Sequence, residues 1–275
     1  MLGGVSFGGY KYYRHLHPKY VPPPPRPEVT ITIIPGWTLR DIAQDWVKKG
    51  LIKTPEELYQ YTGKPAVDYR THGSAEPVPR LFATTTALMD LFADKPTTIS
   101  YEGYMWPDTY RLYADATVPE ILKKIFLEMN SKITPELRAE IKAQNKSLFE
   151  VLTIASILEK EVHGERDRRL VSDIMWSRIK YNLWLQVDSS VHYVTGKTGS
   201  VFTSDEDRNS SSPWNTYKVK GLPLGPIGNP GLDAIKQTLH PEKNDYMYFL
   251  TGKDGKNYFA KTFEEHNVNI RKYLR

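Results

Sequence analysis

Two glutamates in an otherwise apolar segment are the residues of this sequence best suited to catalysis. Glu159 and Glu161 stand near the end of residues 147–166, Ser-Leu-Phe-Glu-Val-Leu-Thr-Ile-Ala-Ser-Ile-Leu-Glu-Lys-Glu-Val-His-Gly-Glu-Arg. A carboxyl group in apolar surroundings has a raised pKa, so it can hold a proton near neutral pH and donate it. Cleavage of a glycosidic bond needs such a general acid. The segment therefore suggests a proton donor that acts on a sugar linkage.

One helix is expected to position both glutamates. Ser147 and Glu150 have the spacing of a reciprocal helix cap, and the pattern predicts a helix over residues 147–166. At about 100° per residue, apolar side chains form a stripe along one face of this helix. The stripe consists of Leu148, Val151, Leu152, Ala155, Leu158 and Val162.

Periodicity alone does not decide which glutamate is the acid. Glu159 projects into the main apolar stripe, whereas Glu161 projects beside Ile154 and Ile157 on a second apolar face. The pattern slightly favours Glu159 as the buried carboxylate. The alternative to catalysis is a solvated Glu-Lys-Glu patch at a helix end, with residues 163–164 (His-Gly) as the exit signal.

Composition excludes several chemistries. The chain has 275 residues, no cysteine and a formal net charge of +5. It therefore has no disulfide, thiolate nucleophile or cysteine-ligated metal. His192, His240 and His266 are scattered without ligand spacing, so we expect no metal and no cofactor. The positive charge suits an anionic partner such as lipid headgroups or a cell-wall polymer. Nucleic acid is a weaker alternative, since no nucleic-acid-binding motif is present.

Three segments are expected along the chain. Residues 1–28 form a disordered or linker segment with a polyproline spacer, which could be the remainder of a truncated membrane anchor. Residues 29–80 form a small strand–helix–helix unit and a polar linker, and residues 81–275 form a larger domain. Helices and strands do not alternate regularly, so the predicted fold class is α+β.

Local signals place further elements. Alternation predicts a strand at residues 29–34, and caps predict helices that begin near Thr38, Thr54 and Thr117, the last running to about residue 132. Residues 246–250 and 257–260 should form a hairpin, followed by a helix capped by Thr262. The Gly/Pro-rich residues 221–231 are either a loop that approaches a ligand closely or a rigid structural loop.

Eight segments, in order along residues 29–275, resemble the MltG-like (YceG-like) endolytic murein transglycosylases of bacteria. The segments are 33–42 (Ile-Ile-Pro-Gly-Trp-Thr-Leu-Arg-Asp-Ile), 102–110 (Glu-Gly-Tyr-Met-Trp-Pro-Asp-Thr-Tyr), 155–161 (Ala-Ser-Ile-Leu-Glu-Lys-Glu), 177–180 (Ser-Arg-Ile-Lys), 185–188 (Leu-Gln-Val-Asp), 215–231, 246–249 and 259–266. The first resembles the family's LysM-like peptidoglycan-binding unit, and the third resembles its catalytic helix. The resemblance thus implies a LysM-like unit at 29–80 and a YceG-like catalytic domain at 81–275.

The resemblance implies that Glu161 is the catalytic acid and base, and that Glu159 is a supporting residue. This goes against the slight preference from periodicity. The chain departs from the family at Ser189 and Ser190, where Pro-Thr is more usual after the Asp. A transmembrane helix usually precedes the LysM-like unit in this family, so membrane association of this protein would depend on an N-terminal anchor that is missing or truncated here.

Five other residues are candidates for binding substrate or supporting the acid: Gln186, Asp188, Asn215, Thr216 and Tyr217. The first two are expected in a polar loop, where they could hydrogen-bond sugar hydroxyls or orient Glu161; a capping or turn role is the alternative. The other three precede the Gly/Pro-rich segment.

The implied reaction is cleavage of the β-1,4 bond between N-acetylmuramic acid and N-acetylglucosamine to give a 1,6-anhydro end. Peptidoglycan glycan strands would be the partner, peptidoglycan synthases are candidate partners, and the outer face of the cytoplasmic membrane is the expected location. A muramidase-type glycoside hydrolase and a noncatalytic peptidoglycan-binding protein are the alternatives. The mass of the product separates the transglycosylase from the hydrolase, because a 1,6-anhydro end is lighter by one water than the hydrolytic end.

Overall fold

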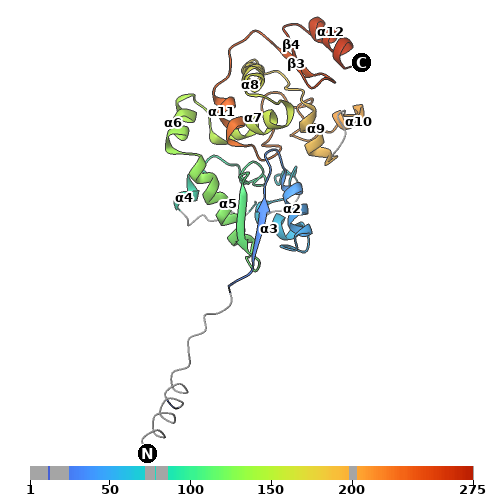
Figure 1. Cartoon of the computed structure of the whole chain (residues 1–275). Helices are drawn as coiled ribbons and strands as arrows, with labels where there is room; N and C mark the ends of the chain where they lie inside the picture. The colour runs from blue at the N-terminus through green and yellow to red at the C-terminus, as the bar shows by residue number, and fades with distance from the viewer. Residues whose placement is uncertain (1–11, 13–24, 72–77, 79–85, 198–202, 275) are drawn as a thin grey trace, which may run out of the picture.

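The computed structural model describes residues 12, 25–71, 78, 86–197 and 203–274. It combines helices with two small antiparallel sheets, which confirms the predicted α+β class (Figure 1). Most of the predicted linker or anchor at 1–28 lies outside the described residues. Within the described part of the chain, no helix has both the length and the apolar character needed to cross a membrane.

A two-stranded ribbon organises the half of the molecule that contains the small unit. Strand β1 (Glu28–Thr32) pairs antiparallel with β2 (Thr109–Tyr113), with Ile31 opposite Tyr110. Helices α2 (Leu39–Lys48) and α3 (Glu56–Thr62) follow β1, and α5 (Val118–Lys132) follows β2. The starts predicted near Thr38 and Thr117 and the end near residue 132 are confirmed, whereas β2 was not predicted.

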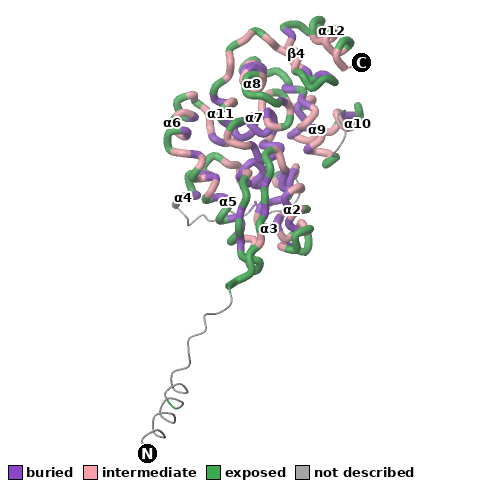
Figure 2. The backbone as a smooth tube through the Cα atoms, viewed as in Figure 1, coloured by how far each residue is buried: buried purple, intermediate pink, exposed green. Residues whose placement is uncertain are grey.

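The small unit shares its hydrophobic core with later parts of the chain. One cluster of buried side chains includes Ile31 and Trp46 from the unit, and Ile125 and Leu152 from beyond it. In Figure 2 buried residues continue from the ribbon into the helices around α7 without a break. The domain boundary at residue 80 stays a prediction, but a unit ending there lacks β2, the strand that β1 pairs with.

Helix α7 (Leu148–Glu161) is surrounded by other elements. Its cap is the predicted one: the Ser147 N–H donates to Glu150 Oε2 at 2.7 Å, and the Glu150 N–H donates to Ser147 Oγ at 3.1 Å. All six residues of the predicted apolar stripe are buried. Helices α8 (Glu165–Lys180), α9 (Asp188–Thr195) and α11 (Leu232–Leu239) contact α7.

The prediction of one helix over residues 147–166 is wrong at its end. Val162 is extended, with φ −139°, and Gly164 has φ +90°, which an L side chain rarely adopts. The chain therefore leaves the helix after Glu161 and starts α8 at Glu165. Glu161 consequently sits at the free C-terminal end of α7 rather than inside a longer helix.

The remaining elements surround this end or extend the core. They are α4 (Thr86–Met89), α6 (Pro135–Ala143), α10 (Asp205–Arg208), β3 (Tyr248–Thr251), β4 (Asn257–Ala260) and α12 (Phe263–Tyr273). Strands β3 and β4 form the predicted hairpin, and Thr262 caps α12 as predicted. The hairpin reaches α7, since the Thr251 hydroxyl lies 3.5 Å from the main-chain oxygen of Glu161.

The Gly/Pro-rich loop at 221–231 packs on the turn after β1. The Gly36 N–H donates to the Asn229 carbonyl, and the Asn229 N–H donates to the Trp37 carbonyl, both at 2.8 Å. A Cβ at Gly228 would lie 2.8 Å from the Gly36 oxygen, so only glycine permits this approach. These contacts favour the structural reading of the loop, which joins the small unit to the rest of the protein.

Candidate active site

Glu161 combines a buried carboxyl group with one firm hydrogen bond. The Ser189 N–H donates to Glu161 Oε1 at 3.0 Å. The carboxyl lies deep among its neighbours, although the residue keeps some exposed surface. Burial raises the pKa of Glu161; Ser189 and Lys160 oppose the rise, and the charge of Asp188 adds to it. A carboxyl of this kind can hold a proton at a higher pH than an exposed glutamate and then stabilise its charge after donating it.

Glu159 is placed differently. Its Oε1 accepts a hydrogen bond from Arg168 Nη2 at 2.7 Å, and its Oε2 accepts one from the Gly231 N–H at 2.9 Å. The side chain is only 10% exposed, so the burial suggested by periodicity is real. Both oxygens are committed to contacts within the protein, which leaves Glu161 as the glutamate available to a substrate.

Asp188 begins a helix instead of lying in the predicted polar loop. It is the first residue of α9, and its Oδ1 accepts three hydrogen bonds. The donors are Thr203 Oγ1 at 2.7 Å, the Tyr217 hydroxyl at 2.9 Å and Arg208 Nη2 at 3.3 Å. Burial and then the charge of Asp188 raise the pKa of Tyr217, so its hydroxyl stays protonated and keeps donating. Asp188 and Tyr217 are therefore brought together beside the Ser189 contact.

Asn215 and Thr216 are both fully buried. The Asn215 amide donates to the main-chain oxygens of Arg208 and Ser210, at 2.9 and 2.7 Å. Thr216 Oγ1 accepts the Val187 N–H at 2.9 Å, just before α9 begins. Because neither side chain reaches solvent, both fit a supporting role for α9 rather than direct contact with a ligand.

Gln186 is exposed and has φ +55°, a backbone conformation that is uncommon outside glycine. Its N–H donates to the Thr216 carbonyl at 3.2 Å, which helps to hold this conformation. The turn leaves the Gln186 side chain at the surface two residues before Asp188. Among the candidates in this loop, it is therefore the one whose side chain is most open to solvent.

Sequence reasoning missed Arg208, Thr203 and Thr251, which complete the polar surroundings of Asp188 and Glu161. Arg208 and Asp188 are 20 positions apart and are joined only by the fold, so no local pattern indicates their contact. No group of three His, Cys, Asp or Glu side chains able to hold a metal is found among the residues that the structure describes.

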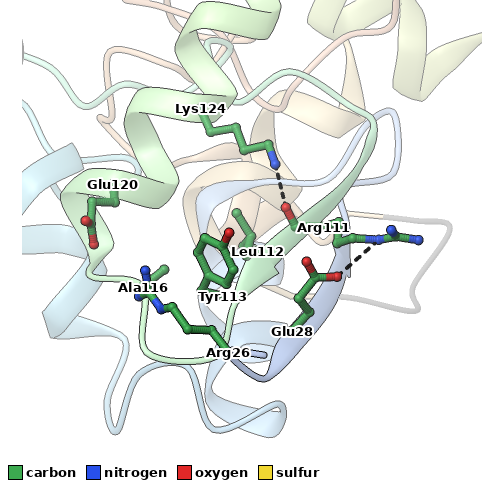
Figure 3. Close-up of a pocket in the computed structure, with 8 residues that line it drawn as sticks. All are labelled: Arg26, Glu28, Arg111, Leu112, Tyr113, Ala116, Glu120 and Lys124. Carbon is green, nitrogen blue, oxygen red and sulfur yellow. Dashed lines mark hydrogen bonds and ion pairs between the residues drawn. The ribbon is translucent and has the colours of Figure 1, made fainter. Parts of the chain in front are cut away.

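A surface hollow lies at the end of the β1–β2 ribbon where β1 begins and β2 ends, and it is a poor candidate for catalysis (Figure 3). Its basic groups have partners within the protein: Arg26 pairs with Asp115, Arg111 lies 3.5 Å from Glu28, and Lys124 donates to the Arg111 carbonyl. None of these residues contacts Glu161 or Asp188. The end of α7 therefore remains the candidate site.

Known proteins place the chain in a family. The sequence model of the YceG-like family matches residues 11–272. An endolytic murein transglycosylase of Bacillus subtilis (strain 168) is 36% identical over 174 residues, which cover 63% of this chain and 48% of that protein. An endolytic murein transglycosylase of Streptococcus pneumoniae serotype 2 is 29% identical over 262 residues, which cover 89% of this chain and 44% of that protein.

The chain therefore spans about half the length of the curated relatives it matches. The crystal structure of a yceG-like protein from Listeria monocytogenes has 30% sequence identity and a TM-score of 0.73, and the match covers 94% of this chain and 80% of that one. The likeness in sequence and in fold extends over both the ribbon half and the α7 half of the molecule. The chain belongs to the YceG-like family.

Proposed function

We propose that this protein is an endolytic peptidoglycan lytic transglycosylase with Glu161 as its single acid and base. The observation that carries the proposal is the difference between the surroundings of Glu159 and those of Glu161 at the end of α7. Glu159 is occupied by Arg168 and the Gly231 N–H, whereas the buried carboxyl of Glu161 accepts one main-chain N–H. The names of the relatives, endolytic murein transglycosylase, support peptidoglycan as the proposed substrate class.

In the first half of the reaction, protonated Glu161 donates its proton to the oxygen that links N-acetylmuramic acid to N-acetylglucosamine. The bond between that oxygen and the anomeric carbon of the muramic acid then breaks. The positive charge that develops is stabilised by the acetamido group of the substrate, as in substrate-assisted glycosidases. The raised pKa of Glu161 suits this step, because the carboxyl keeps its proton at a higher pH than an exposed glutamate does.

In the second half, the Glu161 carboxylate removes the proton from the 6-hydroxyl of the same muramic acid. That oxygen bonds to the anomeric carbon and closes the 1,6-anhydro ring. Glu161 is protonated again by the hydrogen of the 6-hydroxyl, the proton that it donated stays on the leaving hydroxyl of N-acetylglucosamine, and no water is consumed. One carboxyl group therefore serves both steps, with the Ser189 N–H stabilising its charged form between them.

Substrate contacts are proposed on the side of α7 where α9 begins. Gln186 is exposed there, and the Tyr217 hydroxyl is held by Asp188 at 2.9 Å. The LysM-like part of residues 29–80 would add affinity for glycan strands. Such a substrate would put the protein outside the cytoplasm, at the outer face of the cytoplasmic membrane, with peptidoglycan synthases as candidate partners and association with that membrane as part of the proposal.

The product of cleavage tests the proposal. Purified protein is incubated with peptidoglycan sacculi in water enriched in ¹⁸O, and the released fragments are analysed by mass spectrometry. We expect 1,6-anhydro ends without ¹⁸O. Ends that are heavier by one water and carry ¹⁸O would identify a hydrolase instead. Binding to sacculi with no fragments, under conditions where a known transglycosylase releases them, would identify a noncatalytic binding protein.

A further inference from the structure

Ser189 presents two donor groups to the Glu161 carboxyl. Its N–H lies 3.0 Å from Glu161 Oε1. Its Oγ is buried and has no hydrogen-bond partner of good geometry among the described residues, yet it lies close enough to the carboxyl to help lower its pKa. Ser189 is the second residue of α9, and N–H groups in the first turn of a helix have no partner within that helix. The N–H is therefore free to bind the carboxylate.

We propose that Ser189 is a positioning residue that gives the two oxygens of Glu161 different roles. The Ser189 N–H keeps Oε1 as a hydrogen-bond acceptor, and Oε2 carries the transferred proton. The inference rests on the proposed function, since it concerns the acid and base of that reaction. An oxygen that faces an N–H donor is disfavoured as the site of a carboxyl hydrogen, because two hydrogens would then point at each other. No hydrogen bond to Oε2 is found within the described residues, so that oxygen is open to a ligand.

The Ser189 hydroxyl is the second donor group, and it acts when Glu161 is charged. While Glu161 is neutral, its carboxyl is a weaker acceptor for this hydroxyl than the carboxylate is. When Oε2 gives its proton to the leaving oxygen, the carboxylate becomes a strong acceptor, and rotation of the hydroxyl can supply a second, charge-assisted hydrogen bond. When the 6-hydroxyl of the sugar returns a proton to Oε2, the hydroxyl is released again. Ser189 therefore favours the charged form of Glu161 without removing the proton that the first step needs.

Several other groups influence the same carboxyl from the elements packed around it. Lys160, on the same helix, favours the charged form, and Asp188, on α9, disfavours it. Arg208 pairs with Asp188 at 3.3 Å, and Tyr217 donates to Asp188 from the loop beyond. Strand β3 contributes only the Thr251 hydroxyl, which meets the main-chain oxygen and not the carboxyl. Any test of Ser189 must therefore leave these groups unchanged.

Three substitutions at one position separate the two donors. Ser189→Ala removes the hydroxyl and keeps the N–H. Ser189→Pro removes both, at a position in the first helical turn where proline is tolerated. Ser189→Thr keeps both and is the conservative control. Ser131→Ala, on α5, is the matched distant control, because it removes a serine hydroxyl that bonds only to the Glu128 carbonyl. Circular dichroism and melting establish that each protein is folded.

The first readout is the dependence of kcat/KM on pH with soluble glycan strands. Losing a donor to the carboxylate raises the pKa of Glu161, so the pH at which activity falls on the alkaline side should move upward. We expect an upward shift for Ser189→Ala, a larger one for Ser189→Pro, and no shift for Ser189→Thr or Ser131→Ala. A lower rate with an unmoved alkaline limb in folded Ser189→Ala and Ser189→Pro proteins would reduce Ser189 to a structural role and overturn the proposal.

A second readout does not need turnover. The Glu161 carboxyl is titrated by ¹³C NMR of protein labelled at the glutamate carboxyl carbon, with Glu161→Gln used to assign its signal. The same order of upward shifts is expected. If the wild-type protein titrates as predicted but cleaves no peptidoglycan, the proposed function fails. If it cleaves peptidoglycan and the Ala and Pro variants titrate like the wild type, the role of Ser189 alone is overturned.

Discussion

Arg168 and Glu159 form an ion pair with an N–O distance of 2.7 Å, and their side chains are 13% and 10% exposed. The other Glu159 oxygen accepts the N–H of Gly231, directly before α11. One carboxylate thus joins α7, α8 and the start of α11. Both oxygens of the glutamate that periodicity places on the apolar face therefore have partners within the protein, which supports the proposal that Glu161, two residues later, is the acid.

Replacing Glu159 tests this division of roles. Glu159→Gln leaves Arg168 without a charged partner in a largely buried position, and we expect a loss of about 3–5 kcal/mol in the free energy of unfolding. The folded protein should cleave peptidoglycan within a few-fold of the wild-type rate. Thermal melting and single-condition activity, corrected for the folded fraction, measure both. A stable but inactive Glu159→Gln protein would make Glu159 the acid.

The pH dependence of cleavage follows from the raised pKa of Glu161. In the proposed mechanism the free enzyme acts with this carboxyl protonated, so kcat/KM should be constant below the raised pKa and fall as the pH rises through it. The limb should lie above the ordinary value of 4.5, because burial favours the neutral form. A profile of kcat/KM on soluble strands measures this. Activity that only increases from pH 5 to pH 9 would be incompatible with an acid of this kind.

Replacing Asp188 should shift the alkaline limb of the pH profile in the opposite direction from replacing Ser189. Its negative charge helps to raise the pKa of Glu161, so Asp188→Asn should lower that pKa and shift the alkaline limb to lower pH. Asp205→Asn, on the exposed start of α10, removes the same charge elsewhere and should leave the limb in place. Pairing the two variants in one set of pH profiles separates a local effect from a change in net charge. An upward shift for Asp188→Asn would contradict this account.

Glu102 links the small unit to the Gly/Pro-rich loop and gives a prediction for stability. It is 2% exposed and accepts the Leu39 N–H at 3.1 Å and the Asn229 amide at 3.1 Å. Burial raises its pKa to about 7. The folded protein thus binds this proton more tightly than the unfolded chain. The contribution to stability is full below the ordinary value of 4.5 and is lost as the pH rises through about 7.

The melting temperature of the wild-type protein should therefore fall between pH 5 and pH 8. The fall corresponds to a loss on the order of a few kcal/mol in the free energy of unfolding. Glu102→Gln, which cannot ionise, should show a flatter dependence over the same range. Glu56→Gln, at the exposed start of α3, is the control and should keep the wild-type slope. Equal slopes in all three proteins would show that Glu102 does not titrate in this window.

Local signals in the sequence predicted much of the fold. The caps at Ser147, Thr117 and Thr262 each open a helix, because a side-chain acceptor followed three residues later by a glutamate satisfies the first N–H groups. Strand β2 was not predicted, although Tyr110 and Leu112 alternate with exposed residues. Only pairing with the distant segment β1 makes it a strand.

The site was predicted less completely, for the same reason. The apolar stripe of α7 indicated a buried carboxyl, but the choice between Glu159 and Glu161 depends on Arg168, Gly231 and Ser189, which reach the two side chains through the fold. Hydrogen bonds between distant segments leave no periodic trace in a sequence. The resemblance to a family supplied a choice that periodicity could not.

The most direct test of the central claim is the activity of Glu161→Gln on purified peptidoglycan, compared with Glu159→Gln and with Glu165→Gln at the exposed start of α8. The amide keeps the shape of the side chain and can still accept the Ser189 N–H, but it has no proton to donate. We expect a loss of about a hundredfold to ten-thousandfold in kcat/KM with an unchanged circular dichroism spectrum and melting curve, while both control variants stay within a few-fold of the wild type once corrected for folding. Cleavage by a well-folded Glu161→Gln protein at close to the wild-type rate would contradict the account.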